Sequence, residues 1–456
     1  MAGEWPTSTV GAVSRRVTKG TTPTTIGGCF VDAGIAFVKV ESITDDGRFD
    51  RAKFAFIDDH TNHLLARSVL EENDVLFTIA GTIGRVARVS RHVLPANTNQ
   101  AVAIVRPDHS AIDSRFLYYV LRDDLRVKHA HTRVVQSVQA NFSLAELSAI
   151  EVPLPPVPEQ RAIAHILGTL DDKIELSRRM NETLEAMTRA LFKSWFVDFN
   201  PVRAKSEGRD PGLPKHIADL FPDSFEDSEL GEIPRGWEVT VLDPLADVVL
   251  GGDWGGDAHN AERSMPACCI RGADIPDLQI GGRGKMPVRF LKPSSLAKRQ
   301  LTDGDLVVEI SGGSPTQSTG RPVLVSRELL DRLPLPLVCS NFCRLLKLKS
   351  PAYSKFVYLW LRALYANDEL LQFENGTTGI KNLAFTLFSS SFKFCVAPAR
   401  VLEAFDACVS PLFRREQASA AETDSLAALR DVLLPQLIAG ALRVKDAERF
   451  VAGTVS

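Results

Sequence analysis

The chain repeats its own pattern, and the second copy begins about 230 to 240 residues after the first. Four segments of the first copy find counterparts in the second: Trp5 and Trp237, FVKV at 37–40 and CIRG at 269–272, LEENDVLF at 70–77 and LTDGDLVV at 301–308, and TNQAVAIV at 98–105 and SNFCRLLK at 340–347. Self-similarity at a fixed period indicates repeated structural units. The sequence therefore predicts two copies of one fold.

The offset between the copies starts near 231 and rises to about 242 after residue 308. It then holds, because Phe116 matches Phe356, Asn141 matches Asn382 and TLEAM at 183–187 matches SLAAL at 425–429. A single insertion in copy two explains the step. Two similar surfaces in one chain would suit a target with two parts.

Length and composition favour a soluble protein of several domains. A chain of 456 residues exceeds what one hydrophobic core usually organises. Apolar content of 45% and charged content of 24% are ordinary for a globular protein, and no apolar run approaches a membrane span. The start MAGEWPTSTV does not resemble a secretory signal, so we expect a cytoplasmic location. The seven cysteines lack paired metal-ligand spacings, so we expect reduced thiols and no metal site.

Short β-like runs broken by Gly, Pro and Asn fill residues 1–155, and the amphipathic segment 114–125 interrupts them. This pattern is typical of an α+β domain with an irregular sheet. The prolines of VPLPPVPEQ at 152–160 then mark its end, and Glu159 suits the first turn of a following helix.

A long helix is predicted from Glu159 to about Phe196. Its seam residues recur at alternating spacings of four and three: Ile166, Leu170, Lys173, Ser177, Met180, Leu184, Met187 and Leu191. Such a stripe needs a partner helix. The second periodic stretch, from about Arg400 to Ile438, supplies it, and we expect the two helices to pack antiparallel. Pro411 should kink that stretch or break it into two segments.

The predicted fold class is therefore α+β, with two tandem mixed α/β domains, two long antiparallel coiled-coil-like helices and an internal pseudo-two-fold repeat. The predicted boundaries are 1–155 for the first domain, 156–197 for the central helix, 198–236 for a surface linker partly ordered at HIADLF, 237–398 for the second domain, 399–440 for the distal helix and 441–456 for a tail.

Catalytic motifs are missing from the sequence. It has no phosphate-binding loop, no G-x-G-x-x-G after an expected strand, no H-E-x-x-H and no G-x-S-x-G. The net charge of −3 argues against indiscriminate coating of nucleic acid but allows local basic faces, for which 122–133 and 283–299 are candidates. We expect a protein that catalyses nothing by itself.

Two long segments carry a family resemblance. The stretch PLPPVPEQRAIAHILGTLDDKIELSRRMNETLEAMTRALFKSWFVDFNPVRAK at 153–205 resembles the central region of the specificity subunits of Type I restriction-modification systems. SPLFRREQASAAETDSLAALRDVLLPQLIAGALRV at 410–444 resembles their distal region. The resemblance extends over essentially the whole chain, although the β-rich parts match only in outline.

The resemblance implies a non-catalytic subunit in which each β-rich domain is a target-recognition domain for one half of a split, asymmetric DNA site, while the helices set the spacing. It implies two modification subunits that bring S-adenosylmethionine, and two restriction subunits that bring ATP and magnesium, with no cofactor on this chain. Helix-face residues would divide between the helix pair and the modification subunits: Leu184, Met187, Leu191, Phe192, Trp195, Phe196, Leu426, Leu429 and Leu433.

Candidate DNA contacts follow from residue type and position. Base edges in the major groove favour Arg, Lys, Asn, Gln, Ser and Thr on loops, and glycines permit close backbone approach. Plain hairpin turns explain the glycine-rich loops equally well. The candidates are Lys39, Thr78, Thr82, Arg85, Asn99, Gln100, Gln136, Gln139 and Asn141 in copy one, and Arg271, Ser311, Ser314, Gln317, Arg321, Asn341, Lys381 and Asn382 in copy two.

Two other functions are compatible with parts of the pattern. A coiled-coil scaffold with duplicated protein-binding domains would show the same helices, but the unlike loops of the two copies suit two different DNA half-sites better than two identical protein partners. A fused methyltransferase would need several hundred residues of catalytic motifs that the sequence lacks.

Overall fold

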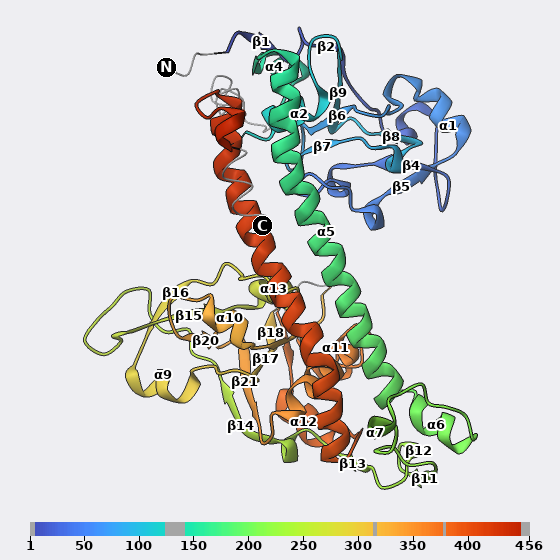
Figure 1. Cartoon of the computed structure of the whole chain (residues 1–456), viewed down its shortest axis with the longest axis vertical. Helices are drawn as coiled ribbons and strands as arrows, with labels where there is room; N and C mark the ends of the chain where they lie inside the picture. Colours follow the sequence, from blue (N-terminus) through green and yellow to red (C-terminus); the bar gives the residue numbers. More distant parts are fainter. Residues whose placement is uncertain (1–4, 124–141, 313–316, 377–379, 448–456) are drawn as a thin grey trace. The chain divides into compact units, whose positions relative to one another are not determined.

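The computed structural model describes residues 5–123, 142–312, 317–376 and 380–447. The chain divides into two compact units: unit 1 comprises residues 1–174 with 425–456, and unit 2 comprises residues 175–424. Two helices of 40 residues each contribute to both units; they are α5 (Val157–Phe196) and α13 (Ala399–Ile438) (Figure 1).

Unit 1 contains two four-stranded sheets, in the orders β2-β9-β6-β7 and β3-β5-β4-β8, together with the pair β1-β10. All pairs are antiparallel except β4 with β8. The strands are β1 (Thr7–Thr9), β2 (Ser14–Lys19), β3 (Phe30–Val31), β4 (Ile35–Val38), β5 (Ala55–Ile57), β6 (Val75–Thr78), β7 (Val86–Arg88), β8 (Ala96–Thr98), β9 (Val102–Pro107) and β10 (Glu151–Pro153). The helices besides α5 and α13 are α1 (Asp59–Leu64), α2 (Ser114–Leu121) and α4 (Leu144–Ala149).

Helix α2 packs between the β6-β7 side of the sheet and α5. Its first turn is fixed by Asp113, whose side chain accepts hydrogen bonds from the backbone N–H groups of Arg115 and Phe116. Gly168 on α5 leaves room for α2, because a Cβ there would lie 2.2 Å from the Arg115 guanidinium carbon. Arg115 donates to the Gly168 carbonyl at 3.0 Å and to Asp172 at 2.7 Å. The glycine inside α5 thus lets the Arg115 side chain lie directly against the helix, and a larger residue would displace this guanidinium group.

Unit 2 repeats this plan. Its main sheet has the order β14-β21-β17-β19, its second sheet has the order β16-β15-β20 with β15 and β20 parallel, and β13 pairs with β24. A small sheet β18-β23-β22 and the hairpin β11-β12 are added. The strands are β11 (Phe225–Ser228), β12 (Gly231–Pro234), β13 (Glu238–Thr240), β14 (Ala246–Gly251), β15 (Met265–Ile270), β16 (Val288–Leu291), β17 (Leu306–Glu309), β18 (Ser311–Gly312), β19 (Pro322–Leu324), β20 (Leu337–Cys339), β21 (Cys343–Leu348), β22 (Glu374–Asn375), β23 (Lys381–Leu383) and β24 (Phe394–Val396). The helices are α6 (Asn200–Ser206), α7 (Lys215–Ala218), α8 (Ile275–Gln279), α9 (Pro293–Arg299), α10 (Arg327–Asp331), α11 (Ala352–Ala366) and α12 (Phe385–Ser391).

The strand registers establish the correspondence between the copies residue by residue. Thr78 pairs with Val102 in unit 1, and Glu309 pairs with Cys343 in unit 2. Thr78 and Glu309 are equivalent positions, because each directly follows its aligned segment, 70–77 or 301–308. Their strand partners Val102 and Cys343 are therefore equivalent as well, whereas the sequence alignment had matched Ala101 to Cys343. That alignment was wrong by one residue at these strands, because sequence similarity in a short buried strand does not fix register. The predicted fold class itself, with its repeat and its two long helices, is confirmed.

The long helices run antiparallel in unit 2, where Ser419 donates to the carbonyl of Ser177 and Asn181 donates to that of Glu416. In unit 1 the same helices are joined by Arg430, which lies 2.8 Å from Asp171. The α13 helix continues through Pro411, so the break into two segments, one of the two predicted outcomes, was wrong. The residues before and after it are held by packing: Phe405 and Val409 are fully buried, and Phe413 packs against the same core. This packing outweighs the hydrogen bond that a proline removes.

Segment 198–236 is more ordered than a surface linker. It forms α6, α7 and the β11-β12 hairpin, and it buries Val202, Phe221 and Ile233. Phe221 packs edge-on against Trp195 with ring centroids 4.9 Å apart. The sequence did not predict these buried apolar residues, because they are few, have no regular spacing and lie among prolines and acidic residues. The segment is part of the core of unit 2.

Candidate nucleic-acid interface

An arginine at the end of the β6-β7 loop ties that loop to the turn after β4. Arg85 donates to the carbonyl of Ile43 at 2.9 Å and pairs with Asp45 at 2.6 Å. Thr78 is buried and organises the same loop, since its hydroxyl donates to the Thr82 carbonyl and accepts from the Arg85 N–H. Thr82 itself is exposed. Among the described residues the Thr82 hydroxyl has no hydrogen-bond partner, whereas Thr78 and Arg85 would have to break a hydrogen bond of their side chains to reach a ligand.

Unit 2 holds the corresponding arginine more tightly. Arg321 forms two hydrogen bonds with Glu309, at 2.6 and 2.7 Å, and one with the Gly272 carbonyl at 2.9 Å. Glu309 is buried, and 11% of the Arg321 side chain is exposed. Burial opposes the charge of Arg321, but the hydrogen bonds and charge of Glu309 outweigh it and raise the pKa of Arg321. When its amide oxygen is turned toward the guanidinium, Gln317 accepts a further bond from Arg321 at 2.8 Å.

Lys39 and Arg271 occupy matching positions at the end of β4 and β15. Each precedes a short 3-10 helix whose third residue accepts a hydrogen bond from its backbone N–H. The Lys39 ammonium lies 3.0 Å from Glu41 and remains partly exposed. The Arg271 guanidinium donates two hydrogen bonds to the buried Asp274 carboxylate. Burial opposes ionisation of Asp274, yet Arg271 and backbone N–H groups lower its pKa overall.

The loops after β8 and β20 present amide side chains. Asn99 caps its own turn by accepting from the Ala101 N–H at 3.1 Å, while Gln100 is exposed and accepts from the Thr22 hydroxyl. In unit 2, Asn341 is exposed and is followed by Phe342, whose side chain is 49% exposed. Phe342 was not among the candidates chosen from the sequence, although an aromatic residue beside Asn in a turn is a recognisable signal.

Several candidates of unit 2 meet at one edge. Ser311 pairs with Asn382 between β18 and β23, and the carbonyl of Phe342 accepts from the N–H of Ser311 at 3.1 Å. Lys381 lies next to Asn382 and pairs with Glu374 at 3.2 Å. This edge therefore combines exposed amides, a hydroxyl, a lysine and an exposed aromatic ring.

Unit 1 has the same connections at its matching edge. The N–H of Phe142 donates to the Ile79 carbonyl, as the N–H of Leu383 donates to that of Ile310 in unit 2. Four candidates lie outside the described residues: Gln136, Gln139, Asn141 and Ser314. That the candidates contact DNA stays a prediction. Those that lie in the described residues are found on equivalent loops and strand ends of the two units.

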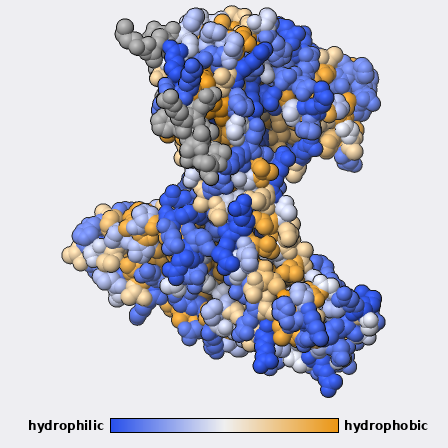
Figure 2. All heavy atoms as spheres, in the orientation of Figure 1, coloured by the Kyte–Doolittle hydropathy of each residue, from blue (hydrophilic) through white to orange (hydrophobic). Residues whose placement is uncertain are grey.

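Most of the helix-face candidates are core residues. In unit 2, Phe192, Trp195 and Phe196 are at most 6% exposed and pack with Phe356 and Phe405. In unit 1, Leu426 and Leu433 are buried and Leu429 is half-buried. Leu184 and Leu191 are half-buried in unit 2, and Met187 is 51% exposed. Figure 2 shows apolar side chains on the visible face of α5 within unit 2.

Within the described part of the chain, no group of three His, Cys, Asp or Glu side chains is arranged to hold a metal ion. In the same residues, no helix is both long and apolar enough to cross a membrane. Burial raises the pKa of the Cys269 and Cys343 thiols to about 12. A raised pKa disfavours the nucleophilic thiolate form of both side chains.

Comparison with known proteins gives one consistent result. The family model "Type I restriction modification DNA specificity domain" matches residues 65–186. The MjaIX specificity subunit of Methanocaldococcus jannaschii, a Type I restriction enzyme subunit, is 26% identical over 381 residues, covering 83% of this chain and 79% of the relative. The HindI specificity subunit of Haemophilus influenzae is 24% identical over 425 residues, covering 82% and 88%.

The fold is also known. A Type I restriction-modification S subunit from M. genitalium superposes with a TM-score of 0.54 at 15% identity, covering 95% of this chain and 96% of that one. At this identity the likeness speaks for the fold alone. By sequence, the chain is therefore similar over most of its length to Type I restriction-modification specificity subunits, and residues 65–186 match their DNA specificity domain.

Proposed function

We propose that the chain recognises a split, asymmetric DNA site, with one β-rich domain for each half-site. This proposal rests on one observation: loops at equivalent positions of the two units are held in the same way but carry different side chains at their edge. Arg85 and Arg321 anchor matching loops, while Ala101 is replaced by Phe342 and the exposed Gln100 by Asn341. A common frame with different side chains at its edge suits two different base sequences, since base edges are distinguished by side-chain donors, acceptors and apolar contacts.

The chain itself supplies no chemistry in this proposal. Two modification subunits would bring the adenine methyltransferase and S-adenosylmethionine, and two restriction subunits would bring ATP, magnesium and the nuclease. The names of the relatives support this division, because they are specificity subunits of Type I restriction enzymes. Methyl transfer by the isolated chain would contradict it. The assembly would work on the cell's own DNA and so in the cytoplasm.

The long helices would set the distance between the half-sites. Seven residues, about two helical turns, inserted after Ile174 in α5 and seven inserted before Ser425 in α13 would lengthen each helix by about 10 Å, close to three base pairs. These positions lie at the boundary between the units in both helices. Mapping of methylated adenines in cells should then show both half-sites intact and a spacer about three base pairs longer.

A matched control places the same seven residues in the exposed turn after Gly208, outside both long helices. The spacer should then keep its natural length. An unchanged spacer in the helix variant, with methylation retained, would refute the spacing role.

A further inference from the structure

The two units contain cavities at corresponding places, and their charges differ. The cavity of unit 1 has a volume of about 420 Å³, and that of unit 2 about 350 Å³. The unit 1 cavity lies between α5, α2 and the turn before β6. The unit 2 cavity lies between α13, α11 and the turn before β17. Asn73, Ser114 and Arg115 line the first, and the matching residues Gly304, Ser354 and Lys355 line the second.

The unit 1 cavity is lined by three arginines, Arg88, Arg115 and Arg161, and by two histidines. Its one carboxylate, Asp113, already accepts the backbone N–H groups at the start of α2. Arg115 is neutralised by Asp172. The cavity therefore has an excess of positive charge.

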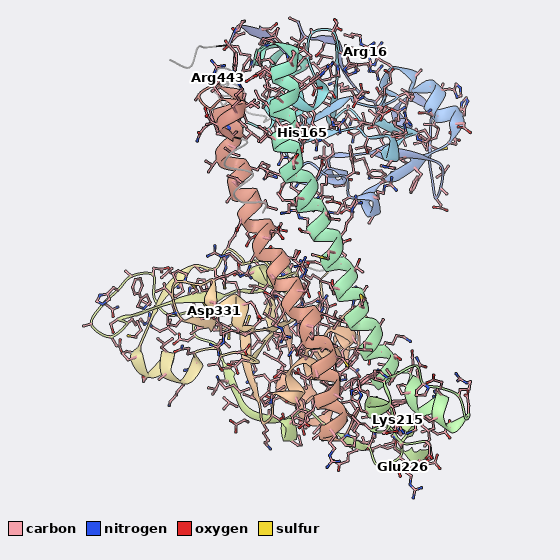
Figure 3. All side chains as sticks on the ribbon, viewed as in Figure 1. Arg16, His165, Lys215, Glu226, Asp331 and Arg443 are labelled. Atoms are coloured by element: carbon pink, nitrogen blue, oxygen red, sulfur yellow. The ribbon has the colours of Figure 1, made fainter. Side chains whose placement is uncertain are left out.

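Arg88 and Arg161 form no ion pair with a carboxylate of the described residues. Arg88 donates to the neutral amide oxygen of Asn73 at 2.7 Å. Within residues 5–123, 142–312, 317–376 and 380–447, no carboxylate lies within ion-pair distance of either arginine. Arg161 and His165 are exposed and lie four residues apart on α5, so their side chains share one face of the helix. Figure 3 labels His165 on this part of α5.

The unit 2 cavity lacks this character. Leu324 lines it where Arg88 lines the other, and Asp406 replaces Ala164 and pairs with Lys355 at 2.7 Å. The helix positions of Arg161 and His165 are occupied by Glu403 and Ala407. Asp303, Glu328 and Glu416 bring the carboxyl groups of the lining to four, against three basic side chains, which are those of Arg327, Lys355 and Arg414. A cavity is therefore present at this position in both units, but the excess of positive charge is found in unit 1 and not in unit 2.

We propose that the basic cavity of unit 1 binds a phosphoryl group. Guanidinium groups present paired N–H donors that match phosphate oxygens, and exposed imidazoles on the same rim can donate further hydrogen bonds. A cavity of this volume exceeds what an ordered water needs and reaches the size of ligand sites. The phosphoryl group could belong to the backbone of bound DNA or to a free phosphate ester. The inference does not depend on which bases the chain recognises.

The test uses the full chain and inorganic phosphate as the probe. Isothermal titration should show saturable binding to the wild type and at least about tenfold weaker binding to the double variant R161Q/H165Q. Both side chains are exposed, and among the described residues neither has a partner to lose, so the variant should fold normally. R327Q removes one positive charge from the rim of the unit 2 cavity and should stay within twofold of wild type.

A second measurement identifies the source of the phosphoryl group. Binding to a random duplex is followed as a function of salt, and each lost phosphate contact lowers the slope of log affinity against log salt by about 0.9. A lower slope in R161Q/H165Q assigns the cavity to the DNA backbone, and an unchanged slope together with lost phosphate binding assigns it to a free phosphate ester. No saturable phosphate binding, or equal binding by the wild type and the double variant, would overturn the proposal, whatever DNA the chain recognises.

Discussion

Glu416 provides a quantitative test of the helix packing in unit 2. It lies on α13, is 6% exposed, and faces Glu185 of α5 and Arg362 of α11. Arg362 is committed to Glu185 at 2.5 Å and to the Tyr358 hydroxyl at 3.2 Å. Burial first, and then the charge of Glu185, raise the pKa of Glu416 from 4.5 to about 7, although Arg362 opposes the shift.

A raised carboxyl pKa lowers stability as pH rises. Between the unfolded value of 4.5 and the folded value of about 7, the folded protein keeps a proton that the unfolded chain has lost. The stability is therefore complete below this window, falls as pH rises through it and levels off above it. A shift of this size corresponds to about 3 kcal/mol.

We expect Glu416→Gln to remove this loss, because glutamine resembles the protonated acid in shape. Relative to wild type, its free energy of unfolding should be nearly unchanged at pH 4.5 and about 3 kcal/mol higher at pH 8. Urea denaturation at the two pH values measures the difference, and carboxyl groups that both proteins share cancel. Glu403→Gln, at an exposed position of the same helix, should change stability by less than about 0.5 kcal/mol at either pH.

An equal effect of Glu416→Gln at both pH values would refute the reasoning. So would a loss of stability at pH 8, because it would mean that the ionised carboxylate of Glu416 is stabilised by Arg362 more than it is destabilised by burial.

Two further predictions concern the corresponding loops. Arg321→Gln should cost about 3 to 5 kcal/mol in urea denaturation because it leaves Glu309 buried without its partner, whereas Arg85→Gln should cost about 1 kcal/mol because Asp45 is 84% exposed; equal costs would contradict the assigned contacts. Phe342→Ala should change the free energy of unfolding by less than about 1 kcal/mol, since half of the side chain is exposed, but should weaken binding to the cognate DNA about tenfold; unchanged affinity would remove Phe342 from the interface.

Sequence periodicity was sufficient for the long helices. The α5 helix was predicted to begin at Glu159, and it begins at Val157 and ends at Phe196, as expected. A heptad seam is a local signal that many residues repeat, so it predicts the existence of a long helix well and its first residue less exactly. Pro411 misled the prediction for α13, because the propensity of one residue was weighed without the buried contacts that hold the helix on both sides.

The candidate interface was predictable only in part. Residue type and the repeat indicated the loops, and the structure gathers Ser311, Lys381 and Asn382 at one edge. The same signals could not show that Thr78 is buried or that Arg321 is committed to Glu309, because those contacts depend on segments that the sequence alone does not bring together. The basic cavity was missed for the same reason, since its residues come from the turn before β6, from β7, from the loop after β9, and from α2 and α5.

The central claim is that each copy of the repeat recognises its own half of one DNA site. The most direct measurement exchanges residues 1–155 for the same region of a relative and maps the methylated adenines in cells that contain the partner subunits. The account predicts a new site in which one half has changed, while the other half and the spacer are retained. A site altered in both halves, or one that keeps both original halves, would contradict it.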